Sequence, residues 1–161
     1  MNELRKIEDN EYTIYALGCI YNNKTKSFIG WEDYNGYLRC KFKGKNQRMH
    51  RIVYETFCGK IREGYEIDHK NRDKADNRIE NLREATKSQN QANKLMSDKN
   101  TSGFVGVNYR EDIKKWRTEI SIDGKKITLG CFNTAIEAAR FRENYIITNN
   151  LSFYTRNFPE M

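Results

Sequence analysis

Two stretches of the chain decide its fold, and they read Glu63-Gly64-Tyr65-Glu66-Ile67-Asp68-His69 and Asn81-Leu82-Arg83-Glu84-Ala85-Thr86. The first ends as a strand at His69, the second predicts a short strand over 81–85, and the polar residues 70–80 between them predict a loop. Thr86 with Gln89 three residues later is a capping box, which predicts a helix from about Lys87 to Met96. Upstream, the helical spacing of the apolar residues over 49–58 predicts a short helix that ends at Gly59.

Asp68 and His69 form the pair with the clearest chemical use. An aspartate supplies the oxygen ligand that Mg²⁺ prefers, and a neutral imidazole can take a proton from water. Neighbouring strand residues point to opposite faces, so both side chains reach one site only where the strand ends or twists. An Asp-His pair alone is weak evidence, and a histidine with a purely structural role is its commoner explanation.

The wider sequence closely resembles the HNH endonucleases, and most of all the branch found among phage and intron homing endonucleases. The matching blocks follow a fixed order over about residues 10–95, and they are Met49-His50-Arg51-Ile52-Val53-Tyr54-Glu55-Thr56-Phe57, Glu63 to His69, Asn81 to Thr86 and Ser88-Gln89-Asn90. The resemblance implies a ββα-metal unit over about residues 62–96 that cuts DNA phosphodiester bonds and leaves a 5′-phosphate and a 3′-hydroxyl.

The resemblance also implies a role for each matching site residue. Asp68 and Asn90 would bind one divalent ion, Mg²⁺ or Mn²⁺, and His69 would be the general base. Asn81 would complete the catalytic set by holding the loop between the two strands. Asn90 stands where the family often has histidine, a variant also found in the homing branch. The block His50-Arg51 is assigned to packing or to phosphate contact.

The chemistry of the residues agrees with these roles and leaves plainer explanations open. Asn90 lies just inside the expected helix N-terminus, where the helix dipole favours a phosphate. As a neutral oxygen ligand it would leave Asp68 as the only negative protein charge on the ion, which keeps the ion a strong Lewis acid. Alternatively, Asn81 makes only turn hydrogen bonds, and Asn90 and Asn93 are solvated helix residues.

A basic strand precedes this region. Between Tyr37 and Arg51 there are six basic residues and no acid. Leu38, Cys40 and Phe42 alternate with basic residues, which predicts a half-buried strand with one basic face. We expect four basic residues of this region to contact DNA phosphates, namely Arg39, Lys41, Lys43 and Arg51.

The C-terminal third has the clearest alternating pattern. Apolar residues alternate with polar ones over 105–110, 116–122 and 126–129, and Asp123-Gly124 is a hairpin turn. Asn133-Thr134 then caps an expected helix to about Asn149. The pattern predicts three antiparallel strands packed on one helix, with Trp116 on the apolar face and a polar, basic face opposite.

Residues 100–150 resemble the apetala-two (ethylene-response-factor) DNA-binding domain. The matching blocks are Ser102-Gly103-Phe104-Val105-Gly106-Val107, Lys115 to Ile120, Gly124 to Phe132 and Thr134 to Ala139. Plant domains of this family usually carry arginine where Val105 and Asn108 stand, so their base specificity does not transfer. We expect the polar face of the sheet to contact DNA through Asn108, Arg110, Lys115, Arg117, Lys126 and Thr128. An ordinary solvated sheet face is the alternative.

Composition narrows the class of protein and its partners. The 161 residues carry 29 Lys and Arg against 22 Asp and Glu, a net charge of +7 that favours nucleic acid or an anionic surface. No stretch approaches a membrane span, and the four scattered cysteines fit reduced thiols in a cytoplasmic protein. We expect duplex DNA as the partner, no obligate protein partner, and a monomer or weak dimer.

The sequence as a whole predicts an α+β protein with two functional parts. Residues 1–96 would form the nuclease domain, 97–103 a linker, 104–152 the DNA-binding domain and 153–161 a tail. The expected activity is metal-dependent cleavage of duplex DNA by a phage or intron homing endonuclease. A non-catalytic DNA-binding regulator that keeps the HNH scaffold is the alternative, and an RNA-directed protein is a third interpretation.

Overall fold

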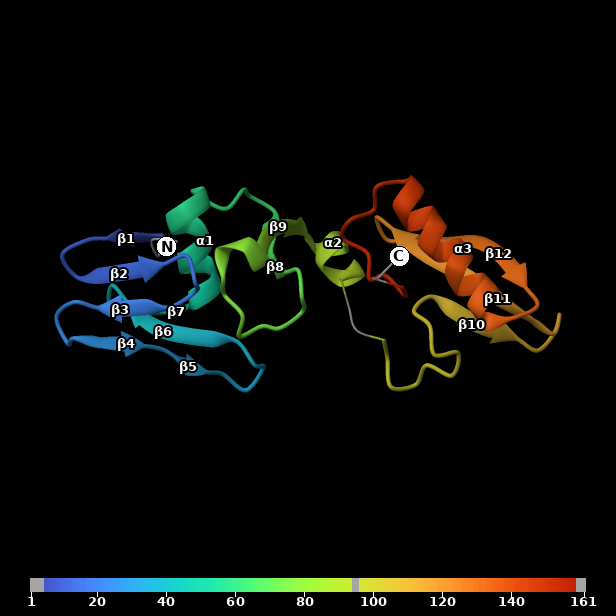
Figure 1. Ribbon diagram of the computed structural model, residues 1–161, viewed down its shortest axis with the longest axis horizontal. Coiled ribbons are helices and arrows are strands. Elements are labelled where there is room, and N and C mark those ends of the chain that lie inside the picture. Colours follow the sequence, from blue (N-terminus) through green and yellow to red (C-terminus); the bar gives the residue numbers. More distant parts are fainter. Residues whose placement is uncertain (1–4, 94–95, 159–161) are drawn as a thin grey trace. The chain divides into compact units, whose positions relative to one another are not determined.

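The computed structural model describes residues 5–93 and 96–158 (Figure 1). The chain divides into two compact units, Met1–Thr86 and Lys87–Met161. Both units combine antiparallel sheets with few helices, so the α+β class predicted from the sequence is confirmed. Within the described ranges, no helix is long and apolar enough to cross a membrane.

The first unit begins with a four-stranded antiparallel sheet in which sequential strands are neighbours. Its strands are β1 (Lys6–Glu8), β2 (Tyr12–Tyr15), β3 (Ile20–Asn22) and β4 (Ser27–Ile29). Tyr12, Ile14 and Ile20 are buried and belong to the core of the unit. Strands β1, β3 and β4 are each three residues long and too short to show an alternating pattern in the sequence.

A second, three-stranded antiparallel sheet carries the basic strand and leads into a helix. Its strands are β5 (Trp31–Glu32), β6 (Leu38–Phe42) and β7 (Lys45–Arg48). Helix α1 (Met49–Cys58) follows at once and ends at Gly59, as predicted. Its buried face contributes Met49, Ile52 and Val53 to the same core as Cys40 of β6.

The first unit ends in a β-hairpin that carries the Asp-His pair. Strands β8 (Tyr65–His69) and β9 (Leu82–Thr86) pair in antiparallel register, and a short 3₁₀ turn, η1 (Ile79–Asn81), leads into β9. Ile67 and Leu82 join the core formed with α1. The predicted order of strand, polar loop and strand is therefore confirmed.

The second unit contains α2 (Lys87–Ala92) and a three-stranded antiparallel sheet covered by a helix. Its other elements are β10 (Val107–Arg110), β11 (Lys115–Ile122), β12 (Lys125–Phe132) and α3 (Ala135–Thr148). Ala138 and Ala139 are fully buried and pack with Val107, Trp116 and Phe132, because small residues let the helix approach the sheet closely. The predicted placement of Trp116 on the apolar face is confirmed.

Helix α3 begins after Thr134, which the sequence indicated as part of its cap and which forms a capping box with Glu137. The Thr134 hydroxyl accepts a hydrogen bond from the Glu137 amide, and the Glu137 carboxylate accepts one from the Thr134 amide. Two unpaired amides at the helix start are thereby satisfied. The helix runs to Thr148, one residue short of the expected end.

Three expectations for the second unit need correction. Helix α2 ends at Ala92 instead of continuing to Met96, and residues 94–95 of the expected helix lie outside the described residues. Strand β10 starts at Val107, so Val105 precedes the strand and its amide donates to the Asn157 side chain instead. A β-bulge between Thr118 and Glu119 shifts the register with β12, which no alternating pattern reveals.

Candidate active site

The hairpin of the first unit brings Asp68 and His69 to the end of β8. In the register, Asp68 lies opposite Arg83 and His69 lies opposite Leu82. Both side chains are buried, with exposed fractions of 5% and 4%. Buried polar groups are costly unless they are bonded, so two consecutive ones at a strand end indicate a built site instead of a solvated loop.

The Asp68 carboxylate is held by Arg83, a residue that no local sequence pattern indicates as part of the site. Arg83 donates from Nε to Asp68 Oδ2 over 2.8 Å, directly across the two strands. The arginine side chain is 18% exposed and the carboxylate 5%, so the ion pair is largely covered by the hairpin and its surroundings. An arginine here neutralises the carboxylate and orients it.

His69 is held by an asparagine from the loop and by two aromatic rings. Its Nε2 lies 3.1 Å from Asn77 Oδ1, and its ring meets the His50 ring edge-on at 5.1 Å between centroids. The Tyr37 ring lies 6.1 Å from the His69 ring. Burial lowers the pKa of His69, while the hydrogen bond to Asn77 and the charge of Asp68 oppose that shift. The imidazole is therefore neutral at neutral pH, the state a proton acceptor needs.

His50 belongs to the packing around His69. Its ring is 3% exposed and also contacts Tyr37, at 5.4 Å between centroids. Burial, helped by the charge of His69, lowers the pKa of His50 to about 3. Of the two roles that the sequence left open for this residue, the structure supports packing.

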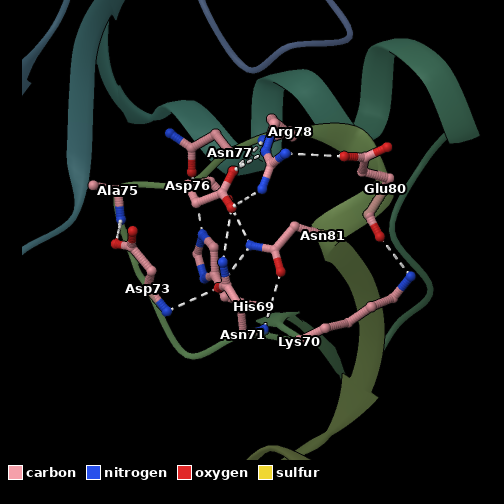
Figure 2. Close-up of polar contacts among 10 residues, drawn as sticks. All are labelled: His69, Lys70, Asn71, Asp73, Ala75, Asp76, Asn77, Arg78, Glu80 and Asn81. Carbon is pink, nitrogen blue, oxygen red and sulfur yellow. Dashed lines mark hydrogen bonds and ion pairs between the residues drawn. The ribbon is translucent and has the colours of Figure 1, made fainter.

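Asn81 ties together the loop between β8 and β9 (Figure 2). Its Oδ1 accepts from the Asn71 amide at 3.0 Å, and its Nδ2 donates to Asn71 Oδ1 at 2.9 Å and to the Asp76 carbonyl at 2.8 Å. Asp76 is in turn paired with Arg78, which lowers the pKa of that carboxyl to about 2. The loop is thus built from side-chain hydrogen bonds.

Asn90 lies on the short helix α2 and is half-buried, as is Asn93 just beyond that helix. Asp68 and His69 belong to the first unit, and Asn90 belongs to the second. Among the described residues, no cluster of three or more His, Cys, Asp or Glu could hold a metal ion. The expected pairing of Asp68 with Asn90 around an ion therefore stays a prediction.

The basic strand β6 places like charges opposite each other. Arg39 lies directly across from Arg48 of β7, and both guanidinium groups attract the Asp33 carboxylate. Like charges at directly opposed positions destabilise a sheet unless an anion joins them. Arg48 also lies over the Tyr37 ring, 4.3 Å from its centroid, and Lys74 lies 4.9 Å from the same ring. Cationic groups therefore gather beside the aromatic cluster that contacts His69.

The other three basic candidates of the first unit differ in their positions and in their acidic neighbours. Lys41 is exposed on β6, opposite Asn46. Lys43 lies beyond the end of β6, with φ +48°, and its Nζ lies 3.3 Å from the Asp9 carboxylate. Lys43 therefore lies in the predicted turn after the strand, beside an acid, and its contact with DNA stays a prediction. Arg51 is exposed on α1, 4.0 Å from the Glu55 carboxylate.

The register of the second unit gathers the six candidate polar residues on one face of the sheet. Asn108 lies opposite Arg117, Arg110 opposite Lys115, and Lys126 and Thr128 lie opposite Ser121 and Glu119. Directly opposed residues of a sheet share a face. Two of the arginines are ion-paired within the chain, Arg110 with Asp112 and Arg117 with Glu119. The face is thus less basic than its lysines and arginines alone indicate.

The sequence missed three residues of the site: Asn77, Arg83 and Tyr37. Asn77 sits in a polar loop rich in Asn and Asp, where composition does not single out one side chain. Arg83 emerges only from the pairing register of two strands. Tyr37 precedes β6 and meets the histidines through contacts far apart in the sequence.

Comparisons with known proteins place this site in a family. A family model described as HNH endonuclease matches residues 47–92. Protein 3.8 of Escherichia phage T7 is 33% identical over 82 residues, which cover 51% of this chain and 68% of that protein. A solved structure described as DNA binding and cleavage by the HNH homing endonuclease I-HmuI aligns with 96% of this chain and 94% of its own, at a TM-score of 0.49 and 22% identity.

The family match spans α1, the β8–β9 hairpin and α2, so it contains Asp68, His69, Asn81 and Asn90. These are the residues to which the family resemblance assigned roles, and the structure buries three of them at the hairpin. The chain belongs to the HNH endonuclease family.

Proposed function

We propose that the protein is a metal-dependent endonuclease that hydrolyses phosphodiester bonds in duplex DNA. The observation that carries the proposal is a buried, neutral His69 beside a buried Asp68, on a hairpin inside the region that matches the HNH family. A histidine kept neutral by burial is suited to general-base catalysis, because a group that is already protonated cannot accept a proton.

His69 takes the proton of the attacking water in this proposal. The ring is held by Asn77 and packed against His50, so its orientation is set before the substrate arrives. Fixed orientation matters because a catalytic group accelerates a reaction only when it is aligned with the reacting atoms. Asn81 acts by keeping the loop that carries Asn77 in one conformation.

Asp68 and Asn90 would hold the divalent ion, with Asn93 near the second ligand. The donor set fits Mg²⁺ or Mn²⁺, because one carboxylate and an amide oxygen are hard ligands, and Mg²⁺ commonly takes few protein ligands and completes its shell with water and phosphate. When bound, the ion supplies Lewis acidity to the scissile phosphate and to the leaving 3′ oxygen. Arg83 orients the Asp68 carboxylate.

DNA contact is proposed for basic groups of both units. In the first unit they are Arg39, Lys41 and Arg51, joined by Arg48 and Lys74 beside the aromatic cluster. In the second unit the polar face of the sheet would lie on DNA in the manner of apetala-two domains. Its contacting residues would be Asn108, Arg110, Lys115, Arg117, Lys126 and Thr128. Linking the two raises effective concentration, so modest affinities combine.

We further propose that residues 1–96 act as the nuclease domain and 104–152 as the DNA-binding domain, joined by 97–103. A monomer with one such site would nick one strand, and a break in both strands would need two chains or two events. The relationship to a phage protein supports a phage-borne or intron-borne homing endonuclease that works in the cytoplasm of its host.

A supercoiled-plasmid assay tests the activity. The full chain should nick the plasmid with Mg²⁺ and not with EDTA, and His69→Ala should slow cleavage by about 10²- to 10⁴-fold. The variant should still bind duplex DNA, which separates loss of chemistry from loss of binding. Equal rates for the two proteins would leave a DNA-binding regulator as the better description, and preferential binding of structured RNA would overturn the substrate.

A further inference from the structure

Asn77 is a deeply buried polar residue that contacts His69, and holding the ring in place does not by itself explain its buried amide nitrogen. Its side chain is 2% exposed, and its Oδ1 lies 3.1 Å from His69 Nε2 (Figure 2). Within the described part of the chain, its Nδ2 is buried without a hydrogen-bond partner. A buried donor without a partner lowers stability, so this amide is poorly chosen for stability alone.

The contact decides which nitrogen of His69 carries the hydrogen. A neutral imidazole has one donor nitrogen and one acceptor nitrogen. Because an amide oxygen only accepts, Nε2 must carry the hydrogen and Nδ1 must carry the lone pair. The His50 ring, edge-on at 5.1 Å, and the Tyr37 ring limit rotation of the imidazole away from this bond.

The N-terminal sheet holds Asn77 in place through a tight turn between β2 and β3. Gly18 in that turn has φ +91°, and a Cβ there would lie 2.5 Å from the Asn77 carbonyl carbon. The Ile79 amide donates to the Ala16 carbonyl at 2.8 Å. Backbone contact this close requires glycine at position 18. The first sheet is thereby coupled to the loop that faces His69.

We propose that Asn77 is a positioning residue that fixes His69 as the Nε2–H tautomer and leaves Nδ1 as the proton acceptor, with the turn at Gly18 holding Asn77 in register. The catalytic consequence rests on the function proposed above, whereas the tautomer is a property of the folded chain itself. The two parts therefore have separate tests.

Nitrogen NMR tests the tautomer without any activity measurement. The chain has two histidines, so ¹⁵N-histidine labelling of the full protein gives two ring systems, and His50→Phe identifies the one from His69. At mildly alkaline pH the wild-type His69 ring should show a protonated Nε2 and an unprotonated Nδ1. A ring with hydrogen on Nδ1, or a free mixture of both forms, overturns the proposal.

Two substitutions at position 77 test whether the Asn77 oxygen sets the tautomer of His69. Asn77→Leu has a similar volume but no acceptor, so the His69 signals should move toward a mixture of tautomers. Asn77→Asp keeps an acceptor oxygen for Nε2 and replaces the amide nitrogen that has no partner with a second carboxylate oxygen. Its negative charge favours the imidazolium, so the spectrum is recorded at a pH where the ring is neutral, and there the Nε2–H form should remain. Asn10→Leu makes the same chemical change at an exposed site of the same unit and should leave the spectrum unchanged. Identical spectra for wild type and Asn77→Leu contradict the proposal, and so does an Asn77→Asp spectrum like that of Asn77→Leu.

Kinetics then test the catalytic consequence. In the plasmid assay Asn77→Leu should lower kcat by about 10- to 100-fold with little change in KM, and Asn77→Asp should recover most of the loss. A merely structural role would lower the amount of folded protein and leave the kcat of the folded fraction intact. A changed tautomer with unchanged kcat would overturn the catalytic part. If the wild type does not cleave, the proposed function fails while the NMR result still stands.

Discussion

The loop between β8 and β9 and the outer face of the β10–β12 sheet are both rich in polar residues, yet they are built in opposite ways. In the loop, Asn77 and Asn81 are buried; the Asn77 side chain bonds to His69 at the end of β8, and the Asn81 side chain bonds to other loop groups. On the sheet face, Asn108 and Lys126 are exposed, and the ion pairs formed by arginines join residues close in sequence. The first arrangement fixes geometry, and the second supplies a surface that a polyanion can approach.

The two regions should also lose different amounts of folding stability when their residues are substituted. A buried polar group loses its partners and cannot recover them from water, whereas an exposed one can. Equivalent substitutions in the two regions should therefore have unequal effects, and pairs of matched variants measure the inequality.

Arg83→Leu should produce the largest loss of stability. It removes the guanidinium from the Asp68 carboxylate, which is 5% exposed, and breaking such a buried pair costs about 3–5 kcal/mol. Arg110→Leu breaks an ion pair of the sheet face whose two side chains are 38% and 58% exposed, and it should cost less than about 1 kcal/mol. Guanidinium unfolding of both variants makes the comparison, and equal losses would show that the burial of Asp68 carries no energetic weight.

Asn81→Leu should have the next largest effect. Three hydrogen bonds to the loop disappear, at about 0.5–1.5 kcal/mol each, so we expect a loss of about 2–4 kcal/mol. Asn108→Leu makes the same change at an exposed position and should stay within about 0.5 kcal/mol of wild type. Urea denaturation monitors both. If Asn81→Leu and Asn108→Leu lose the same amount of stability, Asn81 does not hold the loop.

His50 should make the stability of the first unit depend on pH. Its folded pKa of about 3 lies below the unfolded value of about 6.5, so the unfolded chain binds the proton first. Its contribution is complete above about pH 6.5 and declines by up to about 1.4 kcal/mol per pH unit below it. His50→Phe keeps an aromatic ring and removes the titration, so its stability should fall less steeply between about pH 6 and 4. Parallel curves for the two proteins would exclude His50 as the source.

Lys126→Ala should have the smallest effect on the fold and a measurable one on binding. The side chain is exposed, so stability should change by no more than about 0.5 kcal/mol. If Lys126 contacts a phosphate, the salt dependence of DNA affinity should weaken by about 0.9 in log–log slope. Lys6→Ala, an exposed lysine on β1, is the control and should leave the slope unchanged. A Lys126 variant that behaves like the Lys6 variant would remove this face from the DNA contact.

The parts of the fold that the sequence predicted are those governed by local signals. Helix α1 ends at Gly59 as expected, α3 begins at the expected cap, and the hairpin of Asp68 follows from two short predicted strands around a polar loop. Each depends on residues within a few positions of one another, where spacing and capping chemistry dominate.

The parts that escaped prediction depend on residues far apart in the chain. The bulge at Thr118 and Glu119 exists only in relation to β12, and Arg83 meets Asp68 only through the strand register. The sequence singled out the Asp-His pair, but the contact of Asn77 with His69 requires the loop to be folded and pressed against the turn at Gly18. Tertiary contact, not local preference, sets these positions.

The opposed arginines of β6 and β7 bear on the stability of the protein when no nucleic acid is bound. Arg39 and Arg48 repel each other across the ribbon, and the Asp33 carboxylate of the same unit offsets part of that repulsion. A bound phosphate backbone, as proposed above, would relieve it further, and nucleic acid would then stabilise this ribbon. The protein would then be more stable toward unfolding with nucleic acid bound than without it.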